Sequence, residues 1–252
     1  MTEARIVVTG AASGIGAALV QNLAASGCKV ISVDRKPVAI DPFVACDLTD
    51  PASIDAAAAA INGPIDGIAC VAGVPGTLDA ATVLKVNYLG TRRLVEGLLP
   101  RLRDSGSVVL VASLAARRCG WATDRLREVL SITNWDDALQ AIGPATGNEA
   151  YEISKRLLLA YIPVATAAHT ARRLRFNAVS PGPVETPILG DFTASMGRDR
   201  IEAARNLVGR HALAEEVAAP IQFLLASSAS WVNGIELTVD GGLSAAREAS
   251  AQ

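Results

Sequence analysis

The sequence predicts an α/β protein built on one doubly wound parallel sheet, with a layer of helices on each face of the sheet. Short β-branched runs alternate along the chain with longer segments rich in Ala and Leu. Several of the short runs are apolar throughout, which is typical of parallel strands that are covered on both faces. No repeat, low-complexity linker or block of charge divides the 252 residues, so we expect a single domain over residues 1–252.

The expected elements follow from these runs in chain order. We expect strands at residues 5–9, 29–34, 67–71, 107–111, 174–179 and 236–239. The segments of helical length between them are residues 14–26, 51–61, 87–103, 151–168 and 214–226. Residues 114–150 interrupt this alternation.

Composition argues against several classes of function. The net charge of −2 gives no basic surface for a nucleic-acid backbone or an anionic membrane. The four cysteines lie far apart, without a Cys-x-x-Cys pair or interleaved His, so we expect no metal site and no disulfide framework. The first strand begins too early for a signal peptide, and the longest apolar stretch, Leu157 to Ala168, is too short to cross a bilayer. We therefore expect a cytoplasmic protein with no nucleic-acid or membrane partner.

A glycine-rich turn follows the first expected strand and opens the first expected helix. It reads Thr9-Gly10-Ala11-Ala12-Ser13-Gly14-Ile15-Gly16. Its glycines let the backbone turn tightly and approach a pyrophosphate, while the helix N-terminus offers that anion free N–H groups and a positive dipole end. The turn therefore predicts a Rossmann-type fold, with a three-layer α/β/α arrangement. The dinucleotide site of this fold would be formed by Gly10, Ser13, Gly14, Ile15 and Gly16.

Asp34 lies eighteen residues beyond Gly16, at the end of the second expected strand. A carboxylate there can accept hydrogen bonds from both hydroxyls of the adenosine ribose, and it would repel the additional phosphate of NADP. Arg35 and Lys36 follow immediately and could pair with that phosphate, so NADP remains the less favoured alternative. We predict NAD (NADH) as the cofactor, with Asp34 and Arg35 beside its ribose.

Further motifs follow in a fixed order along the chain. They are Asp47-Leu48, Ala72-Gly73, Asn87, Ser113, Tyr151-x-x-x-Lys155, Ser180-Pro181-Gly182 and Val239-Asp240-Gly241-Gly242. Together with the spaced glycine pattern, they resemble the short-chain dehydrogenase/reductase family over nearly the whole chain. One departure is visible. Where many relatives have Asn-Asn-Ala-Gly, this chain reads Cys70-Val71-Ala72-Gly73, so the hydrogen bonds of those asparagines are absent.

The resemblance assigns further residues to the cofactor. It implies that Asp47 and Leu48 border the adenine ring and that Ala72 and Gly73 line the cofactor cleft. It also implies that a turn at Pro181 and Gly182 is followed by contacts of Val184 and Thr186 with the carboxamide.

Tyr151 and Lys155 have the residue types and the spacing that alcohol oxidation needs. Oxidation removes a proton from oxygen, and a free tyrosine with a pKa of about 10 is a poor base at neutral pH. A cation in a site of reduced dielectric would lower that pKa. Lys155 emerges from the same helix face one turn later and can supply the charge. The resemblance also has this lysine hydrogen-bonding the nicotinamide ribose.

Two polar residues complete the predicted catalytic set of Asn87, Ser113, Tyr151 and Lys155. Ser113 follows the strand at 107–111 at the carboxyl edge of the sheet, where open α/β folds bind ligands, and can hold the substrate oxygen. Asn87 would complete a proton path through a water. Each also has an ordinary interpretation, as a serine at a strand end or as a helix cap. Their occurrence together, in the family's order, favours catalysis.

Stretches such as residues 71–77, 85–90 and 230–234 resemble the branch of the family that contains coniferyl-alcohol dehydrogenase and 3α-hydroxysteroid dehydrogenase/carbonyl reductase. The resemblance implies an NAD(H)-dependent oxidoreductase that interconverts a bulky apolar alcohol, of aryl, terpenoid or steroid type, and its aldehyde or ketone. An epimerase or dehydratase with the same Tyr-Lys pair is one alternative, and it would release no reduced cofactor. A non-catalytic NAD-binding protein is another, but Tyr151 and Lys155 are both present.

The 37 residues between Ser113 and Tyr151 are far more than a βα loop requires. Apolar residues recur there at helical spacing, first as Leu126, Val129 and Leu130 and then as Trp135, Leu139 and Ile142. Asn134 is placed to cap the second helix, and Gly143-Pro144 to end it. We predict a helix-turn-helix insertion beside the substrate mouth, with Trp121 or Trp135 as apolar wall.

A homo-oligomer is also expected. In the hydroxysteroid dehydrogenase/carbonyl reductase that the chain resembles, a similar insertion blocks the usual helix-to-helix dimer surface. The resemblance therefore implies a dimer formed through residues 214–225 and 236–239, with a tetramer as the alternative.

Overall fold

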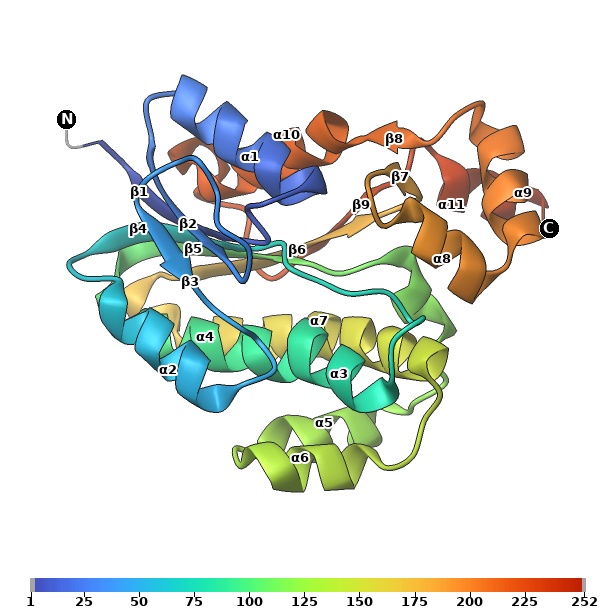
Figure 1. Ribbon diagram of the computed structural model, residues 1–252, viewed down its shortest axis with the longest axis horizontal. Helices are drawn as coiled ribbons and strands as arrows, with labels where there is room; N and C mark the ends of the chain where they lie inside the picture. The colour runs from blue at the N-terminus through green and yellow to red at the C-terminus, as the bar shows by residue number, and fades with distance from the viewer. Residues whose placement is uncertain (1–2, 251–252) are drawn as a thin grey trace.

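A seven-stranded parallel sheet forms the centre of the molecule (Figure 1), in the computed structural model that describes residues 3–250. Its strand order is β3-β2-β1-β4-β5-β6-β9. The strands are β1 (Arg5–Thr9), β2 (Lys29–Asp34), β3 (Phe43–Ala45), β4 (Ile65–Cys70), β5 (Leu102–Val111), β6 (Arg175–Pro181) and β9 (Glu236–Val239). The order reverses between β1 and β4, and in open α/β sheets ligands bind in the crevice at the carboxyl ends of the strands beside such a point.

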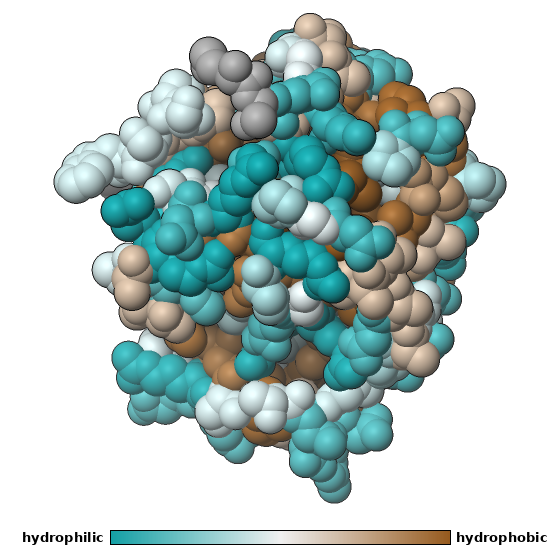
Figure 2. Space-filling view, turned by 90° about the vertical axis from the view of Figure 1, so that its left-hand side faces the viewer, coloured by the Kyte–Doolittle hydropathy of each residue, from teal (hydrophilic) through white to brown (hydrophobic). Residues whose placement is uncertain are grey.

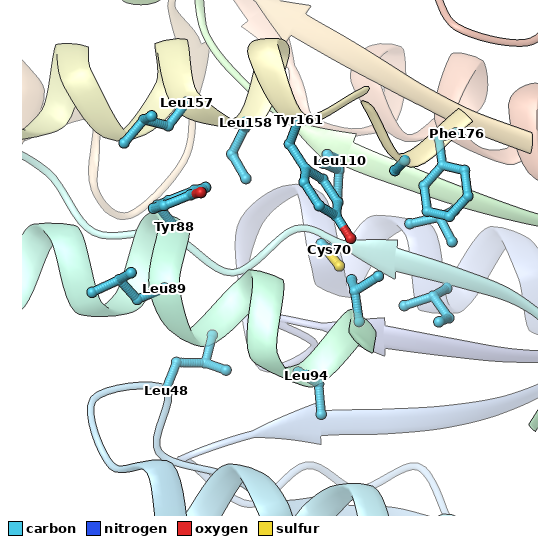
Figure 3. Packing of buried hydrophobic residues seen from close by; sticks show 14 of the residues in the cluster. Leu48, Cys70, Tyr88, Leu89, Leu94, Leu110, Leu157, Leu158, Tyr161 and Phe176 are labelled. Carbon is cyan, nitrogen blue, oxygen red and sulfur yellow. The ribbon is translucent and has the colours of Figure 1, made fainter. Parts of the chain in front are cut away.

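Helices cover both faces of the sheet, as the sequence predicts. On one face lie α1 (Gly14–Ala25) and α10 (Ala214–Leu225), and on the other α2 (Pro51–Ala60), α4 (Thr91–Leu98) and α7 (Gly147–Ala168) (Figure 1). Successive residues of β5 pack alternately into the two layers: Val108 and Leu110 on the α7 side, Val109 and Val111 on the α1 side. Figure 3 shows the core on the α7 side, where aliphatic side chains surround Tyr88 and Tyr161.

The long helix expected at residues 87–103 differs from prediction at both ends. It begins earlier, with α3 (Ala80–Leu84), continues through a π-helix at Lys85–Gly90 and ends with α4 at Leu98. Pro100 cannot donate the next helical hydrogen bond, so the chain passes through one 3-10 turn into β5. Residues 102 and 103 are therefore strand, and Leu102 pairs with Ile65 of β4.

Several short elements have no counterpart in the expected list. They are β3, the two-stranded pair β7 (Val184–Glu185) and β8 (Ala212–Leu213), α8 (Leu189–Met196), α9 (Arg198–Val208) and α11 (Leu243–Ser250). Helices α8, α9 and α11 lie together at the carboxyl end of the sheet (Figure 1). The opposite end of the molecule, seen in Figure 2, is mainly hydrophilic across its middle.

The insertion between β5 and α7 forms the predicted helix-turn-helix, with α5 (Thr123–Ser131) and α6 (Trp135–Ile142). Asn134 caps α6, because its side-chain oxygen accepts hydrogen bonds from the N–H groups of Asp136 and Asp137 at 2.9 and 3.0 Å. The pair packs outside the helix layer (Figure 1). There Arg92 of α4 donates to the carbonyl oxygens of Leu130 and Ile132, at 2.9 and 3.2 Å.

Across residues 3–250, the structure contains no helix that is both long enough and apolar enough to traverse a bilayer.

Candidate active site

A cavity of about 610 Å³ runs along the carboxyl ends of β1, β2, β4, β5 and β6. Its lining includes every residue predicted to bind the cofactor and three of the four predicted catalytic residues. These are Gly10, Ser13, Gly14, Ile15, Gly16, Asp34, Arg35, Asp47, Leu48, Ala72, Gly73, Ser113, Tyr151, Lys155, Pro181, Gly182, Val184 and Thr186. Positions that are distant in sequence therefore meet at one edge of the sheet.

The glycine-rich turn closes against the neighbouring strand. Gly10 has a φ of +70°, and a Cβ atom there would lie 2.8 Å from the backbone of Ala72. A Cβ on Gly16 would lie 2.0 Å from the carbonyl oxygen of Gly10, so neither position has room for a side chain. Thr9, the first residue of the motif, had no predicted role. It fixes the turn to the segment after β4, since its hydroxyl accepts hydrogen bonds from the N–H groups of Val71 and Ala72 at 3.1 Å.

Asp34 lies at the end of β2, as predicted, and faces this turn. Its carboxylate accepts hydrogen bonds from the N–H of Ala12 at 3.0 Å and from the N–H of Lys36 at 2.9 Å. The second acid of this region, Asp47, accepts from the N–H and the hydroxyl of Thr49 at 2.8 and 2.7 Å. Those hydrogen bonds, with a smaller contribution from the charge of Arg35, lower the pKa of Asp47. Both carboxylates are therefore held in place by the backbone around them.

Tyr151 and Lys155 lie one turn apart on α7 and are both buried, at 6% and 3% exposure. The ammonium nitrogen of Lys155 lies 5.7 Å from the centre of the Tyr151 ring. It donates a hydrogen bond of 2.8 Å to the carbonyl oxygen of Val111, at the end of β5. Ser113 follows two residues later and caps the 3-10 helix at Leu114–Arg118 by accepting from the N–H of Ala115. The end of β5 therefore positions both the lysine and the serine against the tyrosine.

Burial dominates the proton affinities of these two side chains. It raises the pKa of Tyr151 to about 12, whereas the hydrogen bond between the Tyr151 and Ser113 side chains and the positive charge of Arg118 act to lower it. Burial also lowers the pKa of Lys155 to about 8. The structure thus differs from the expectation that Lys155 brings the tyrosine pKa down, because the loss of hydration of the phenolate outweighs the nearby charges.

Asn87 does not line the cavity, and its side chain is fully buried in the π-helix. Its amide joins the π-helix to the segment after β4: it donates to the carbonyl oxygen of Val74 at 3.0 Å and accepts from the N–H of Val74 at 2.8 Å. A Cβ atom on Gly73 would lie 3.4 Å from both the Asn87 side-chain oxygen and the Lys155 nitrogen. Asn87 therefore holds the wall of the cavity next to the lysine, and it is not a cap of the following helix.

The cavity wall opposite the sheet comes from α8 and α9, two helices that were not predicted from the sequence. Phe192 contacts Tyr151, with 5.3 Å between ring centres in an edge-on arrangement, and Met196 lies one turn further along α8. Leu189, Phe192 and Met196 recur at helical spacing, and this pattern could have predicted α8 from the sequence. Asn148 of α7 ties this wall to the catalytic helix by donating to the carbonyl oxygen of Ser195.

The insertion meets the cavity only through its first residues, Leu114, Ala115 and Arg118, and the expected apolar wall from its helices is wrong. Neither Trp121 nor Trp135 lines the large cavity. The two helices instead extend the core below α7, where Leu126, Val129 and Ile142 are buried. The ends of the insertion are anchored at Ser113 and Tyr151, but its apolar face packs against the outer side of α7, because that side also presents apolar residues.

Two family models match the chain, the short chain dehydrogenase model over residues 4–123 and the Enoyl-(Acyl carrier protein) reductase model over residues 131–244. With the fold and the cavity described above, these matches place the chain in a known class: it belongs to the short-chain dehydrogenase/reductase family. It is accordingly a nicotinamide-dependent oxidoreductase that acts on alcohols and carbonyl compounds.

The similar proteins place the chain in one branch of this family. It is 38% identical to coniferyl-alcohol dehydrogenase of Pseudomonas sp. (strain HR199 / DSM 7063), over 96% of this chain and 97% of that one. It is 32% identical to 3-alpha-hydroxysteroid dehydrogenase/carbonyl reductase of Comamonas testosteroni, over 95% and 96%. Among solved structures, the 3-alpha-hydroxysteroid dehydrogenase from Pseudomonas sp. B-0831 complexed with NADH matches with a TM-score of 0.83 and 34% identity, over 98% and 99%.

Proposed function

We propose that this chain is an NAD(H)-dependent enzyme that interconverts a bulky, mainly apolar alcohol and its aldehyde or ketone, with Tyr151 as the acid/base. One observation carries the proposal: Tyr151, Ser113 and Lys155 meet in the same cavity as the glycine-rich turn and Asp34. This arrangement supports a substrate oxygen at Ser113 and Tyr151, with the cofactor along the rest of the cavity. The described cysteines are free thiols, which supports action in the reducing cytoplasm.

The residues of the cavity fit a dinucleotide. Ser13 is the N-cap of α1 but makes no side-chain hydrogen bond to the first turn, so no side chain occupies the N–H groups that would meet a pyrophosphate. Gly14 and Ile15 of that turn line the cavity, while Asp34 and Asp47 lie at its adenosine end. Val184 and Thr186 would contact the carboxamide. When bound, the nicotinamide accepts or delivers the hydride.

Tyr151 would take the proton from the alcohol during oxidation and return it during reduction. Its high pKa favours the protonated, proton-donating form at neutral pH, which suits carbonyl reduction. Oxidation needs the phenolate, and Lys155 remains mostly protonated at pH 7 because its pKa is about 8. The ammonium charge would therefore stabilise the phenolate, while Ser113 holds the substrate oxygen. Asn87 would act by fixing the segment beside Lys155, and a water between these two groups would continue the proton path.

An apolar substrate body is supported by the wall around the tyrosine. Phe192 contacts Tyr151, and Leu78, Ile188 and Met196 are further apolar residues of the cavity lining. The names of the two relatives described above, a coniferyl-alcohol and a hydroxysteroid dehydrogenase, point the same way. The proposal is tested by following NADH absorbance over a panel of cinnamyl alcohols, 3-hydroxysteroids and bicyclic terpenols. Formation of neither NADH nor NADPH from any of them would contradict it.

The cofactor preference gives a separate prediction. Asp34→Ala removes the carboxylate that would bind the ribose hydroxyls and repel a 2′-phosphate, and Arg35 is then free to pair with that phosphate. We expect the ratio of kcat/KM for NAD over NADP to fall by roughly 10- to 100-fold, as for the loss of one charge-assisted contact. Initial rates with both cofactors measure it. A wild-type enzyme that uses NADPH better than NADH would overturn the assignment.

The oligomer gives another prediction, a dimer formed through α10 and β9. Strand β9 is an edge of the sheet, and exposed apolar side chains flank it: Trp231 is 98% exposed and Phe223 of α10 is 45% exposed. The paired substitution Phe223→Glu and Trp231→Glu is expected to shift the solution mass from dimer to monomer, as measured by light scattering. A wild-type tetramer packed through α4 and α7 would exclude this interface.

A further inference from the structure

Arg118 lies at the substrate side of the cavity, in a position that the proposed proton transfer does not use. It ends the 3-10 helix Leu114–Arg118, which begins directly after Ser113. The Arg118 side chain lines the large cavity together with Tyr151, and its charge is close enough to lower the pKa of that tyrosine. A guanidinium group therefore stands beside the reacting end of the cavity.

The guanidinium is fixed from its far side. Its Nε donates a hydrogen bond of 2.6 Å to the carboxylate of Glu152, the residue that follows Tyr151 on α7. Glu152 lines a second cavity of about 320 Å³ but is not part of the lining of the large one, whereas Arg118 lines both. The ion pair thus anchors Arg118 to the catalytic helix without placing the carboxylate in the large cavity.

The two terminal amino groups of this guanidinium, Nη1 and Nη2, make no hydrogen bond to the protein within residues 3–250, and the Arg118 side chain is 30% exposed. One N–H of Nη1 and one of Nη2 form the end edge of the guanidinium, which Glu152 does not take. Such an edge matches the two oxygens of a carboxylate in a bidentate pair.

The other charged residues of the cavity do not cancel the attraction of Arg118 for a carboxylate. Apart from the residues at the adenosine end, the charged lining of the cavity also includes Arg200 of α9 and Arg247 of α11, against the single carboxylate of Asp191. Asp34 and Asp47 lie at the other end, with the adenosine site. An anion at the substrate side therefore meets a surplus of positive charge.

We propose that Arg118 determines specificity by binding a carboxylate carried by the substrate, so that the preferred substrates are alcohols with an apolar body and one acidic group. This rests on the proposed function and narrows its substrate class. The apolar body would pack against Phe192 and Met196, the reacting oxygen would lie at Ser113 and Tyr151, and the acidic group would form two parallel hydrogen bonds with Nη1 and Nη2.

The test compares acids with their neutral esters. The 3- and 4-(hydroxymethyl)benzoates and their methyl esters share the same alcohol and ring, so the ratio of kcat/KM for acid over ester isolates the carboxylate. We expect the wild type to favour the acid of at least one pair. Arg118→Met is expected to lower that ratio by roughly 10- to 100-fold, as for a charge-assisted pair. A general change in Tyr151 reactivity affects acid and ester alike and cancels in the ratio.

Glu152→Gln separates a binding role from a purely structural one. It removes the negative partner but keeps the Nη1 and Nη2 donors, so the acid preference should persist or increase. A wild type that favours neither acid, or a Glu152→Gln enzyme that loses the preference as fully as Arg118→Met, would overturn the proposal.

Calorimetry distinguishes a failure of the carboxylate-binding proposal from a failure of the proposed function. If no alcohol of any kind is oxidised, binding of 4-(hydroxymethyl)benzoate to the protein with NADH still reports on Arg118. Weaker binding to Arg118→Met than to wild type supports the carboxylate site, and equal binding contradicts it.

Discussion

Replacing Tyr151 by Phe is expected to lower kcat by roughly 10³- to 10⁴-fold, near the upper end of what one positioned acid/base contributes. The affinity for NADH should stay almost unchanged. The substitution keeps the aromatic ring, and with it the contact to Phe192 at 5.3 Å, but removes the hydroxyl that lies beside Ser113. Steady-state turnover and fluorescence titration of NADH measure the two effects separately.

Tyr161→Phe is the matched control for this loss. Tyr161 lies on the same helix and is equally buried, at 6% exposure, but it packs in the core against Phe176 and does not line the cavity. Its loss of a hydroxyl should leave turnover near the wild-type value. A Tyr151→Phe enzyme that retains a tenth of wild-type turnover would exclude Tyr151 as the acid/base.

Lys155→Ala is expected to weaken cofactor binding and to shift the pH profile of alcohol oxidation to higher pH. Burial holds the pKa of Tyr151 above its usual value, and the ammonium of Lys155, 5.7 Å from the centre of the Tyr151 ring, is a cation on the same helix that can stabilise the phenolate. Without it the phenolate forms only at still higher pH, so the rising limb of the profile must move upward. Oxidation rates between neutral and alkaline pH, with saturating alcohol, measure the displacement.

Lys155→Met controls for the space that Lys155→Ala also empties. Both variants leave the carbonyl oxygen of Val111 without its 2.8 Å partner, and only the methionine fills most of the side-chain volume. The same upward shift in both variants attributes it to the loss of the ammonium group and not to the loss of side-chain volume. An unchanged profile in both would show that Lys155 does not tune Tyr151.

The elements that the sequence predicted best are those whose identity depends on local pattern alone. Strands β1, β2 and β9 begin and end at the expected residues, because each is centred on a short run rich in Val, Ile, Leu or Thr. The cap of α6 by Asn134 was also predicted from the sequence, since capping needs only residues within one turn. The start of β5 was not predicted, because Leu102 becomes strand through its pairing with Ile65, a contact distant in sequence.

For the site, too, local sequence patterns predicted some features, whereas features that depend on distant contacts were not predicted. The residues on strand ends and on the first turns of helices converge in the cavity as the motifs predict. What could not be predicted is how the chain after β6 returns over the cavity, which places Phe192 against Tyr151. The position of the insertion was misjudged for a related reason. Its anchoring residues lie at the cavity, but the direction of α5 and α6 depends on the apolar outer face of α7.

The insertion has a consequence for how the catalytic helix responds to dilution. In an assembled protein, a partner that covers an apolar helix face departs when the concentration falls. Here the cover on α7 is part of the same chain and is tethered at both ends, which corresponds to an effective concentration on the order of millimolar or more. Leu126 and Val129 therefore remain packed in the core below Tyr151 at any protein concentration, and the geometry of the catalytic helix is a property of the single subunit.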